Sequence, residues 1–235
     1  MNTLITNQNE LFTLLDALFK ENAKFDWNAF YTNRESGVPF FKNSPDENLV
    51  QYIESRQIAP SRVLDLGCGP GRNAFYLAQQ GSMVDAVDAS HEAIKWAKER
   101  ADQLKLDIHF LLGDIFEMNF EKDGYDFIYD SGCFHHLYPH RRISYLALLE
   151  KLLQPGGYFG ICSFKPNGEL GGFDEGDISV YRAWRTFGGI GYSIEDLTNI
   201  FHSFELIEIR QMKQGTDNQF GYPEFNVALF KKPSK

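Results

Sequence analysis

Cysteine is scarce in this chain of 235 residues, and its scarcity excludes two classes of small protein. The three cysteines, Cys68, Cys133 and Cys162, lie far apart in apolar, strand-like segments. Their odd number and wide spacing exclude a disulfide framework, and no C-x-x-C pair offers the ligand spacing of a zinc site. We therefore expect reduced thiols, a cytoplasmic protein and no bound metal.

Positive charge and long apolar runs are lacking as well. The 23 Lys and Arg residues are outnumbered by 32 Asp and Glu residues, which gives a formal net charge of −9. Nucleic-acid binding depends largely on cations that neutralise phosphates, so this charge argues against a nucleic-acid partner. No segment approaches the length of a membrane span, and the N-terminus lacks a basic start followed by an apolar run. We expect no membrane partner.

The chain is organised around one glycine-rich stretch, Asp65-Leu66-Gly67-Cys68-Gly69-Pro70-Gly71. The apolar residues at its start predict a short buried strand, the alternate glycines predict a loop, and Arg72 begins a helix. Glycine allows positive φ angles and lets the backbone pass close to a ligand. A dinucleotide loop, G-x-G-x-x-G, would have its third glycine at position 72, where this chain has arginine. The loop therefore fits a nucleotide cofactor without a pyrophosphate.

Helices and strands are predicted to alternate on both sides of this loop. A composition that is 43% hydrophobic and 15% aromatic is that of a folded chain, one large domain or a domain with an appendage. The predicted helices span residues 8–20, 45–57, 72–80, 91–104, 141–153 and 193–201, and the strands 62–66, 83–88, 108–112, 125–130, 158–164, 204–212 and 225–231. The helix at 45–57 is expected to begin with a capping box at residues 44–47. Alternation of this kind predicts a parallel sheet with ligands at the carboxyl ends of its strands.

The glycine-rich stretch resembles the first motif of the class I S-adenosylmethionine (SAM)-dependent methyltransferases, and the resemblance covers about residues 45–231. It implies an α/β fold: a Rossmann-like, doubly wound, seven-stranded sheet, mostly parallel with an antiparallel C-terminal strand hairpin, plus an N-terminal helical cap. Residues 131–142, together with Pro39-Phe40-Phe41, are similar to the thiopurine and tellurite-resistance branch. This narrower likeness implies a thiol, chalcogen or other soft acceptor.

The resemblance also implies where the cofactor lies. Asp65 and the glycine backbone would hold its amino-acid end. Asp88 lies about twenty residues beyond the loop, where an acid can accept hydrogen bonds from ribose hydroxyls; alternatively it helps to cap the helix that Ser90 begins. Asp114 would meet the adenine amino group, or it forms a turn. The predicted cofactor-binding residues are Tyr31, Asp65, Gly67, Gly69, Gly71, Asp88, Ala89, Asp114, Ile115 and Asp130.

Residues 1–44 are predicted to form a helical and aromatic arm that precedes the methyltransferase domain at residues 45–235. The arm either packs on the core or closes as a lid over the cofactor, and the resemblance favours the lid. Tyr31 is the expected neighbour of the sulfonium, with Trp27 and Phe41 as further candidates. Aromatic faces attract a sulfonium for the same electrostatic reason that they attract an ammonium group.

A glycine-rich, aromatic insertion at about residues 165–192 has no clear period. Segments of this length inside compact domains are often functional. It is expected either to cover the substrate as a wall or to form a covering helix at residues 181–186. The wall would contain Phe173, Tyr181, Trp184, Arg185 and Phe187.

The candidates for catalysis follow the fourth predicted strand. Methyl transfer requires alignment and the exclusion of water, and it requires a base only where the acceptor carries a proton. Asp130, His135 and His136 are the candidates, and we predict His135 and His136 as the catalytic residues. Neighbouring side chains point in different directions, so one histidine is expected to pack while the other faces the site. The alternative for His136 is a structural role.

The same region lacks two motifs of nucleic-acid methylation. Enzymes that methylate base nitrogens carry an Asn/Asp-Pro-Pro-Tyr/Phe motif here, where this chain reads Asp130-Ser131-Gly132-Cys133. Cys133 also lacks the preceding proline and the basic surroundings of a carbon-methylating nucleophile. Both departures disfavour a nucleic-acid substrate.

These observations predict an enzyme that transfers a methyl group from SAM to a small-molecule acceptor and releases S-adenosylhomocysteine. One alternative is a SAM-binding sensor without turnover. Another is an NAD(P)-dependent oxidoreductase, against which Arg72 argues directly. We expect a monomer or a homodimer.

Overall fold

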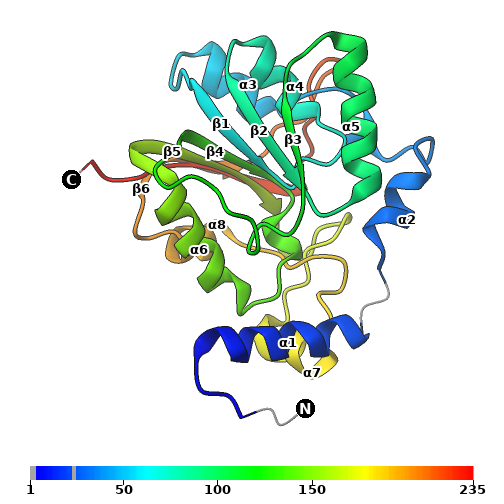
Figure 1. Cartoon of the computed structure of the whole chain (residues 1–235), viewed down its shortest axis with the longest axis vertical. Coiled ribbons are helices and arrows are strands. Elements are labelled where there is room, and N and C mark those ends of the chain that lie inside the picture. Colours follow the sequence, from blue (N-terminus) through cyan, green and yellow to red (C-terminus); the bar gives the residue numbers. More distant parts are fainter. Residues whose placement is uncertain (1–3, 23–24, 235) are drawn as a thin grey trace.

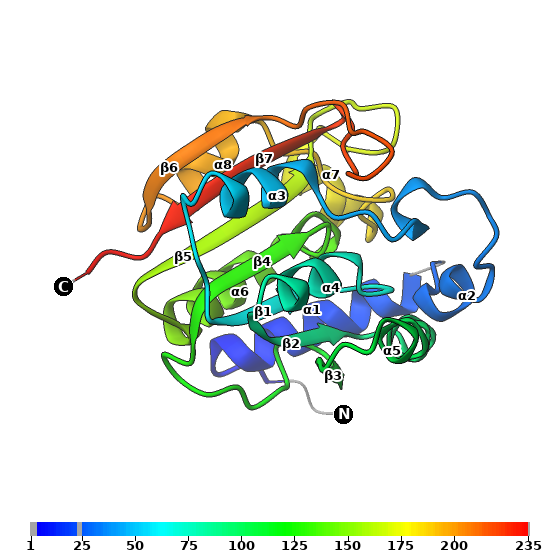
Figure 2. The same ribbon diagram turned by 90° about the horizontal axis from the view of Figure 1, so that it is seen from above.

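The fold is a seven-stranded sheet with helices on both faces, as the computed structural model in Figures 1 and 2 shows. The structure describes residues 4–22 and 25–234; residues 1–3, 23–24 and 235, at the ends and within the predicted arm, lie outside this description. The strand order is β3-β2-β1-β4-β5-β7-β6. The strands are β1 (Arg62–Leu66), β2 (Met83–Asp88), β3 (His109–Leu112), β4 (Tyr125–Ser131), β5 (Leu153–Phe164), β6 (Glu205–Gln211) and β7 (Phe225–Lys231).

The direction of the strands confirms the predicted fold class. β1 to β5 are parallel to one another, whereas β7 inserts antiparallel between β5 and β6. The chain runs outward from β1 to β3 and then returns to β4 on the other side of β1. In open α/β sheets, ligands bind at such a reversal, outside the carboxyl ends of the strands.

The helices form one layer on each face of the sheet. Residues of α3, α4 and α5 share one hydrophobic cluster with one side of the strands, and residues of α6 and α8 share another cluster with the other side. Successive residues of β1 alternate between the two, with Val63 in the first cluster and Leu64 in the second. The helices are α1 (Gln8–Asn22), α2 (Trp27–Thr32), α3 (Glu47–Glu54), α4 (Arg72–Gln79), α5 (His91–Leu104), α6 (Arg141–Leu152), α7 (Gly176–Ala183) and α8 (Ile194–Ile200), with 3₁₀ turns η1 (Pro39–Phe41) and η2 (Phe134–His136).

Most element ends follow the local sequence signals. The Ser90 side chain caps α5 by accepting a hydrogen bond from the backbone of Ala93. Ser193 and Asp196 form a reciprocal capping box at the start of α8. Gly81, at φ +93°, follows the end of α4. These positions confirm the predicted helix boundaries because the polar caps satisfy backbone groups that a helix leaves unpaired.

The start of α3 differs from its prediction. The helix begins at Glu47 and ends at Glu54, and its N-cap residue, Asp46, makes no side-chain capping bond. The Asp46 carboxylate instead accepts hydrogen bonds from Arg72, Asn73 and Tyr129. The predicted capping box at residues 44–47 is therefore wrong, because this carboxylate is engaged by buried partners far along the chain.

Two later boundaries also differ. β5 begins at Leu153 rather than at 158, since the segment that looked like a turn already pairs with β4 at Tyr125. A covering helix does form in the insertion, but α7 ends at Ala183 and Trp184 takes a left-handed conformation at its end. The predicted helix at residues 181–186 was therefore placed too late.

The N-terminal helix α1 lies over the segments that follow β4 and β5, beside α7 (Figure 1). Phe19, which is 1% exposed, stacks on Tyr138 at a ring distance of 4.0 Å and meets Trp184 edge-on at 5.2 Å. Asp16 of the same helix pairs with His140 and Arg141. The helix thus covers the carboxyl-end side of the sheet.

Within residues 4–22 and 25–234, no helix combines the length and the apolar character that crossing a membrane requires.

Candidate active site

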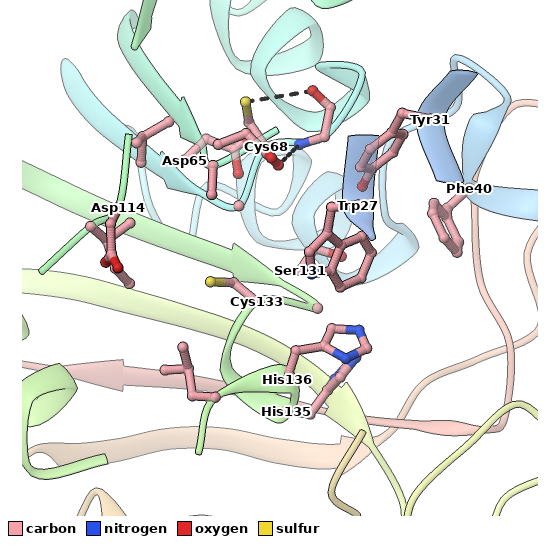
Figure 3. A pocket seen from close by; sticks show the side chains of 18 of the residues that line it. Trp27, Tyr31, Phe40, Asp65, Cys68, Asp114, Ser131, Cys133, His135 and His136 are labelled. Atoms are coloured by element: carbon pink, nitrogen blue, oxygen red, sulfur yellow. Dashed lines mark hydrogen bonds between the residues drawn. The ribbon is translucent and has the colours of Figure 1, made fainter. Parts of the chain in front are cut away.

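A cavity of about 300 Å³ opens at the carboxyl ends of the parallel strands (Figure 3). Its floor is formed by the glycine loop after β1 and the segments after β2, β3 and β4. Its remaining walls come from α1, α2, η1, the end of β5 and the connection before β7. A volume of this size suits a small-molecule site.

Two glycines of the glycine loop line the cavity at positions where a side chain would be crowded. Gly67 has φ +65°, and a Cβ there would lie 2.6 Å from the Cβ of Cys133. Gly69 has φ +52°, and its Cβ would lie 3.1 Å from the hydroxyl oxygen of Tyr31. Both glycines line the cavity.

Gly71 occupies a different position from the one predicted. It is the N-cap of α4, at φ +89°, and a Cβ there would lie 2.6 Å from the ring of Phe75. Gly71 does not line the cavity. The absence of a side chain at Gly71 allows the start of the helix to pack against Phe75. The spacing of the three glycines predicted that all of them bind the cofactor, whereas only Gly67 and Gly69 line the cavity.

Asp65 presents a buried carboxylate to the cavity. Its side chain is 2% exposed, and Oδ2 has no hydrogen-bond partner among the described residues. Burial raises the pKa of Asp65 to about 8, an effect that the nearby Arg72 guanidinium opposes. A buried carboxylate oxygen without a donor is costly. A ligand with an ammonium group could supply the missing donor.

Asp88 links the glycine loop to the end of β2. Its carboxylate accepts a hydrogen bond from the Gly69 amide at 2.9 Å and another from the Ser90 amide at 2.7 Å. Burial raises the pKa of Asp88, and the two amide donors oppose that effect. Because each carboxylate oxygen can accept more than one hydrogen bond, Asp88 can still accept hydroxyls from a ligand. Ala89, which follows it, also lines the cavity.

Asp114 and Ile115 line the cavity where the chain leaves β3. The Asp114 carboxylate accepts a hydrogen bond from the Phe116 amide at 2.9 Å. The two alternatives for Asp114 are thus compatible, because a turn-forming carboxylate keeps free lone pairs. Phe116, which the prediction did not single out, lines the cavity and lies beneath the Arg141 guanidinium at 5.0 Å.

Asp130 does not reach the cavity. It is fully buried, and its carboxylate accepts hydrogen bonds from the Cys133 amide at 2.8 Å, the Phe134 amide at 3.0 Å and the Tyr145 hydroxyl at 2.6 Å. Burial raises its pKa to about 6, and these donors oppose the effect. The prediction of Asp130 as a ligand-binding or basic residue is corrected: its carboxylate holds the turn after β4, in which Cys133 lines the cavity.

The two histidines of η2 have different surroundings. His135 is 2% exposed; its Nδ1 accepts a hydrogen bond from the Phe164 amide at 3.2 Å, and its ring stacks on Phe164 at 4.0 Å. His136 is half-buried, and neither of its ring nitrogens has a hydrogen-bond partner among the described residues. Its ring meets Trp27 edge-on at 4.8 Å. Both line the cavity, but the packed member of the pair is His135.

Burial controls the charge of both imidazoles. It lowers the pKa of His136 to about 4 and holds the pKa of His135 well below its usual range, with His136 adding to the effect. Both rings are therefore neutral at pH 7. A neutral His136 with unpartnered nitrogens can accept a proton or a hydrogen bond from a ligand.

Arg72 is the most prominent cavity residue whose role the sequence did not indicate. Its Nη1 lies 2.6 Å from the Asp46 carboxylate, its Nη2 donates to the Ser131 hydroxyl at 2.9 Å, and its guanidinium lies 4.3 Å from the centre of the Phe220 ring. The only sequence signal was negative, an arginine where a dinucleotide loop has glycine. Its partners lie 26, 59 and 148 residues away and could not be identified from spacing.

Five rings that line the cavity form what we call the aromatic wall: Trp27, Phe40, Phe164, Phe220 and Phe225. Phe40, rather than the predicted Phe41, lines the cavity; Phe41 is 5% exposed and packs against Tyr31 and Trp96. Tyr31 lies between the aromatic wall and Gly69 (Figure 3). The wall joins segments that are remote in sequence.

The insertion at residues 165–192 does not line the cavity as predicted. Of its five proposed wall residues, Tyr181 and Trp184 contact Phe19 of α1, and Phe173 stacks on Phe187 at 4.1 Å. None of the five borders the cavity in the described part of the chain. The insertion instead supports the helix that covers the site.

Cys133 lines the cavity as a thiol whose pKa burial raises well above its usual value, so it is a poor nucleophile. Across residues 4–22 and 25–234, no group of three or more His, Cys, Asp or Glu side chains could hold a metal ion.

Comparison with known proteins agrees with this site. Residues 63–157 match the family described as a methyltransferase domain. An uncharacterized methyltransferase of Schizosaccharomyces pombe is 34% identical over 138 residues, which are 59% of this chain and 86% of the relative.

Two solved structures share the fold. TehB from Haemophilus influenzae superposes with a TM-score of 0.60 at 25% identity, over 79% of this chain and 61% of TehB. The 1,6-didemethyltoxoflavin-N1-methyltransferase of Burkholderia thailandensis, bound to its substrate and S-adenosylhomocysteine, has a TM-score of 0.64 at 21% identity over 99% of this chain and 93% of that chain.

Proposed function

The chain belongs to the class I SAM-dependent methyltransferases, and from this premise we propose that it methylates a small-molecule acceptor. The observation that carries the proposal is the buried Oδ2 of Asp65, a residue that lines the cavity; this oxygen has no hydrogen-bond donor among the described residues. The ammonium group at the amino-acid end of SAM supplies a donor and a positive charge for this oxygen. The hydrogen-bond acceptors of the cavity thus fit SAM, the methyl donor.

The other cavity residues have matching roles in this proposal. Asp88 accepts the ribose hydroxyls, since its lone pairs are not exhausted by the two amides it already binds. Asp114 accepts the adenine amino group, and Ile115 packs on the ring. Gly67 and Gly69 let the backbone approach the cofactor.

SAM, when bound, supplies a methyl group on a sulfonium, and the leaving group is a neutral thioether. The residues of this chain align the acceptor and exclude water. Tyr31 offers an aromatic ring above the glycine loop, where a cation is favoured. His136 receives the proton of the acceptor on an unpartnered ring nitrogen, and His135 positions the turn through its bond to the Phe164 amide.

The size and cover of the cavity support a small acceptor. The helices α1 and α2 and the turn η1 contribute walls on the side where a large substrate would have to enter. The net charge of −9 opposes binding to nucleic acid. The toxoflavin-precursor enzyme named above, whose printed substrate is a small molecule, supports the same class by its fold.

Calorimetry tests the cofactor first. S-adenosylhomocysteine and NADH are titrated separately into the purified protein, with an Asp88→Ala variant alongside. Micromolar binding of the adenosyl ligand that the variant weakens at least about tenfold is the expected result. Binding of NADH alone would overturn the proposal.

A turnover assay tests the enzyme itself. The protein is incubated with SAM and a metabolite extract, and the S-adenosylhomocysteine released is measured. No release above the protein-only control would indicate a sensor rather than an enzyme.

A further inference from the structure

The two halves of the cavity differ in chemistry, and the sheet order separates them. The three carboxylates of the floor, Asp65, Asp88 and Asp114, follow β1, β2 and β3, which form one half of the sheet. In the other half, Phe164 ends β5 and Phe225 begins β7, with no carboxylate from either strand in the cavity lining. The acidic half suits the methyl donor, SAM, so the methyl acceptor is expected to bind against the aromatic wall.

Three rings of the aromatic wall contact one another. Phe164 stacks on Phe225 at 5.0 Å with an interplanar angle of 21°, and Phe220 meets Phe225 at 6.0 Å. Trp27 closes the opposite side, with Phe40 beside it (Figure 3). Aromatic rings that line a cavity favour a flat aromatic partner, because offset stacking buries large areas in a defined geometry.

The charged side chain on this half of the cavity is already paired. Arg72 lies over Phe220 and is the charged side chain that borders the wall; its partner carboxylate, Asp46, is fully buried and outside the lining. The fourth carboxylate of the cavity, Asp16, is held by Arg141 and His140. A cationic amine would therefore meet the Arg72 guanidinium with no carboxylate of the lining free beside it, because Asp46 already pairs with Arg72.

The imidazole of His136 lies beside these rings. His136 lies 4.8 Å from Trp27 and 6.1 Å from Phe164, ring centre to ring centre, and its nitrogens are unpartnered among the described residues. A donor on a ligand held by the wall could reach this imidazole.

We propose that the acceptor is a planar aromatic or heteroaromatic molecule, neutral or anionic, whose reacting atom carries an ionisable hydrogen directed at His136. The inference rests on the proposed function and names its substrate class. In the reaction the heteroatom bonds to the methyl carbon as the carbon–sulfur bond breaks. The electron pair of that bond stays on sulfur, and the hydrogen leaves the acceptor as a proton on the His136 imidazole.

Three probes built on a fused pair of six-membered carbon rings separate planarity from charge. The protein saturated with S-adenosylhomocysteine is titrated by calorimetry with 2-naphthol, with 2-naphthylmethylamine, which is an ammonium ion at pH 7, and with 2-decalol, the saturated analogue of 2-naphthol. We expect 2-naphthol to bind at least about tenfold more tightly than either. Equal or tighter binding of 2-decalol would overturn the planar class, and tighter binding of the amine would overturn the charge assignment.

Variants then locate the binding to the aromatic wall. Phe225→Leu and Phe40→Leu are expected to weaken 2-naphthol about fivefold or more while S-adenosylhomocysteine affinity stays within about twofold. Phe187→Leu, outside the cavity, is the matched control and should change neither. Phe40 lies on a turn rather than on a strand, so it remains informative if Phe225→Leu does not fold.

The two proposals fail in different ways. If wild-type protein does not bind S-adenosylhomocysteine, the proposed function itself is wrong. If it binds that ligand and 2-naphthol shows no preference or no sensitivity to the wall variants, only the acceptor class is wrong.

Discussion

The side chains of Asp46 and Arg72 form a buried ion pair with a separation of 2.6 Å, at 0% and 7% exposure. The pair joins the start of α3 to the start of α4, directly behind the glycine loop. Asn73 and Tyr129 also donate to the Asp46 carboxylate. The arginine that distinguishes this loop from a dinucleotide loop is thus held in a fixed position facing the cavity.

Removing the charge of Asp46 should destabilise the protein strongly. Asp46→Asn leaves the Arg72 guanidinium buried without its anion, which typically costs about 3–5 kcal/mol. The matched control is Glu121→Gln, which breaks the exposed Arg62–Glu121 pair and should change stability by less than about 1 kcal/mol. Urea unfolding measures both, and equal small changes would contradict the role of the buried pair.

Gly67 should tolerate no side chain. Gly67→Ala places a Cβ 2.6 Å from Cys133 at a positive φ, whereas Gly37→Ala, at φ +74°, meets no atom within 4 Å. Both variants carry the backbone strain of about 1 kcal/mol, and only Gly67→Ala adds steric overlap of about 1–3 kcal/mol. We expect thermal unfolding to show this difference and S-adenosylhomocysteine binding to fall at least about tenfold in Gly67→Ala alone. Equal behaviour of the two variants would remove the contact with Cys133 from the explanation.

Cofactor binding should release a proton near neutral pH. With a pKa of about 8, Asp65 is mostly protonated at pH 7 in the free protein, and a bound ammonium group favours its ionised form. The binding enthalpy of S-adenosylhomocysteine should therefore vary with the ionisation enthalpy of the buffer, and affinity should rise from pH 6 to pH 8. Asp65→Asn should abolish both effects. A buffer-independent enthalpy in the wild type would place the ammonium group elsewhere.

The same carboxyl group should make the free protein less stable as pH rises. The folded pKa of Asp65, about 8, lies above the value near 3.9 of an unfolded chain, so the folded state holds a proton that the unfolded state has lost. This contribution to stability is present at acidic pH and is lost between about pH 4 and pH 8. Comparison of wild type with Asp65→Asn isolates it, because the amide does not titrate. Parallel stability curves for the two proteins would show that Asp65 ionises normally.

The sequence predicted the elements well where local signals decide them. Alternating apolar residues, Gly81 after α4 and the caps at Ser90 and Ser193 act within a few residues, so strand and helix positions followed. The capping box at residues 44–47 failed because Asp46 is bound by Arg72, a tertiary contact that overrides a local preference.

The cavity was predictable in its acidic half only. Asp65, Asp88 and Asp114 each follow a strand, and parallel strands end at one edge of the sheet. The aromatic wall joins α2, η1, β5 and β7, and nothing in local spacing tells that Phe220 lies under Arg72. Asp130 looked equivalent to the other strand-end acids, but the Tyr145 hydroxyl and two amides turn its carboxylate inward.

Alanine variants should distinguish the roles of the two adjacent histidines. His136→Ala removes the unpartnered imidazole and should weaken 2-naphthol binding about tenfold with little effect on melting temperature. His135→Ala removes the acceptor of the Phe164 amide and a stacked ring, and should destabilise the fold by about 1–3 kcal/mol. Because the pKa of His136 is about 4, 2-naphthol affinity should show no inflection near pH 6.5. An inflection there that His136→Ala removes would mean that the imidazole is charged in the free site.

The helix α1 should act as a removable cover of the cavity rather than as part of the core. Phe19 is its main anchor, packed between Tyr138 and Trp184, while Asp16 on the same helix lines the cavity. A core phenylalanine replaced by alanine costs about 3–5 kcal/mol, but a helix that undocks alone limits the loss to its own docking energy. Phe19→Ala should therefore cost less than that, while S-adenosylhomocysteine dissociates at least about fivefold faster and proteases cut within α1. Leu11→Ala, at a position 38% exposed on the same helix, is the control and should change none of these. The full loss of stability with unchanged dissociation and proteolysis would assign α1 to the core.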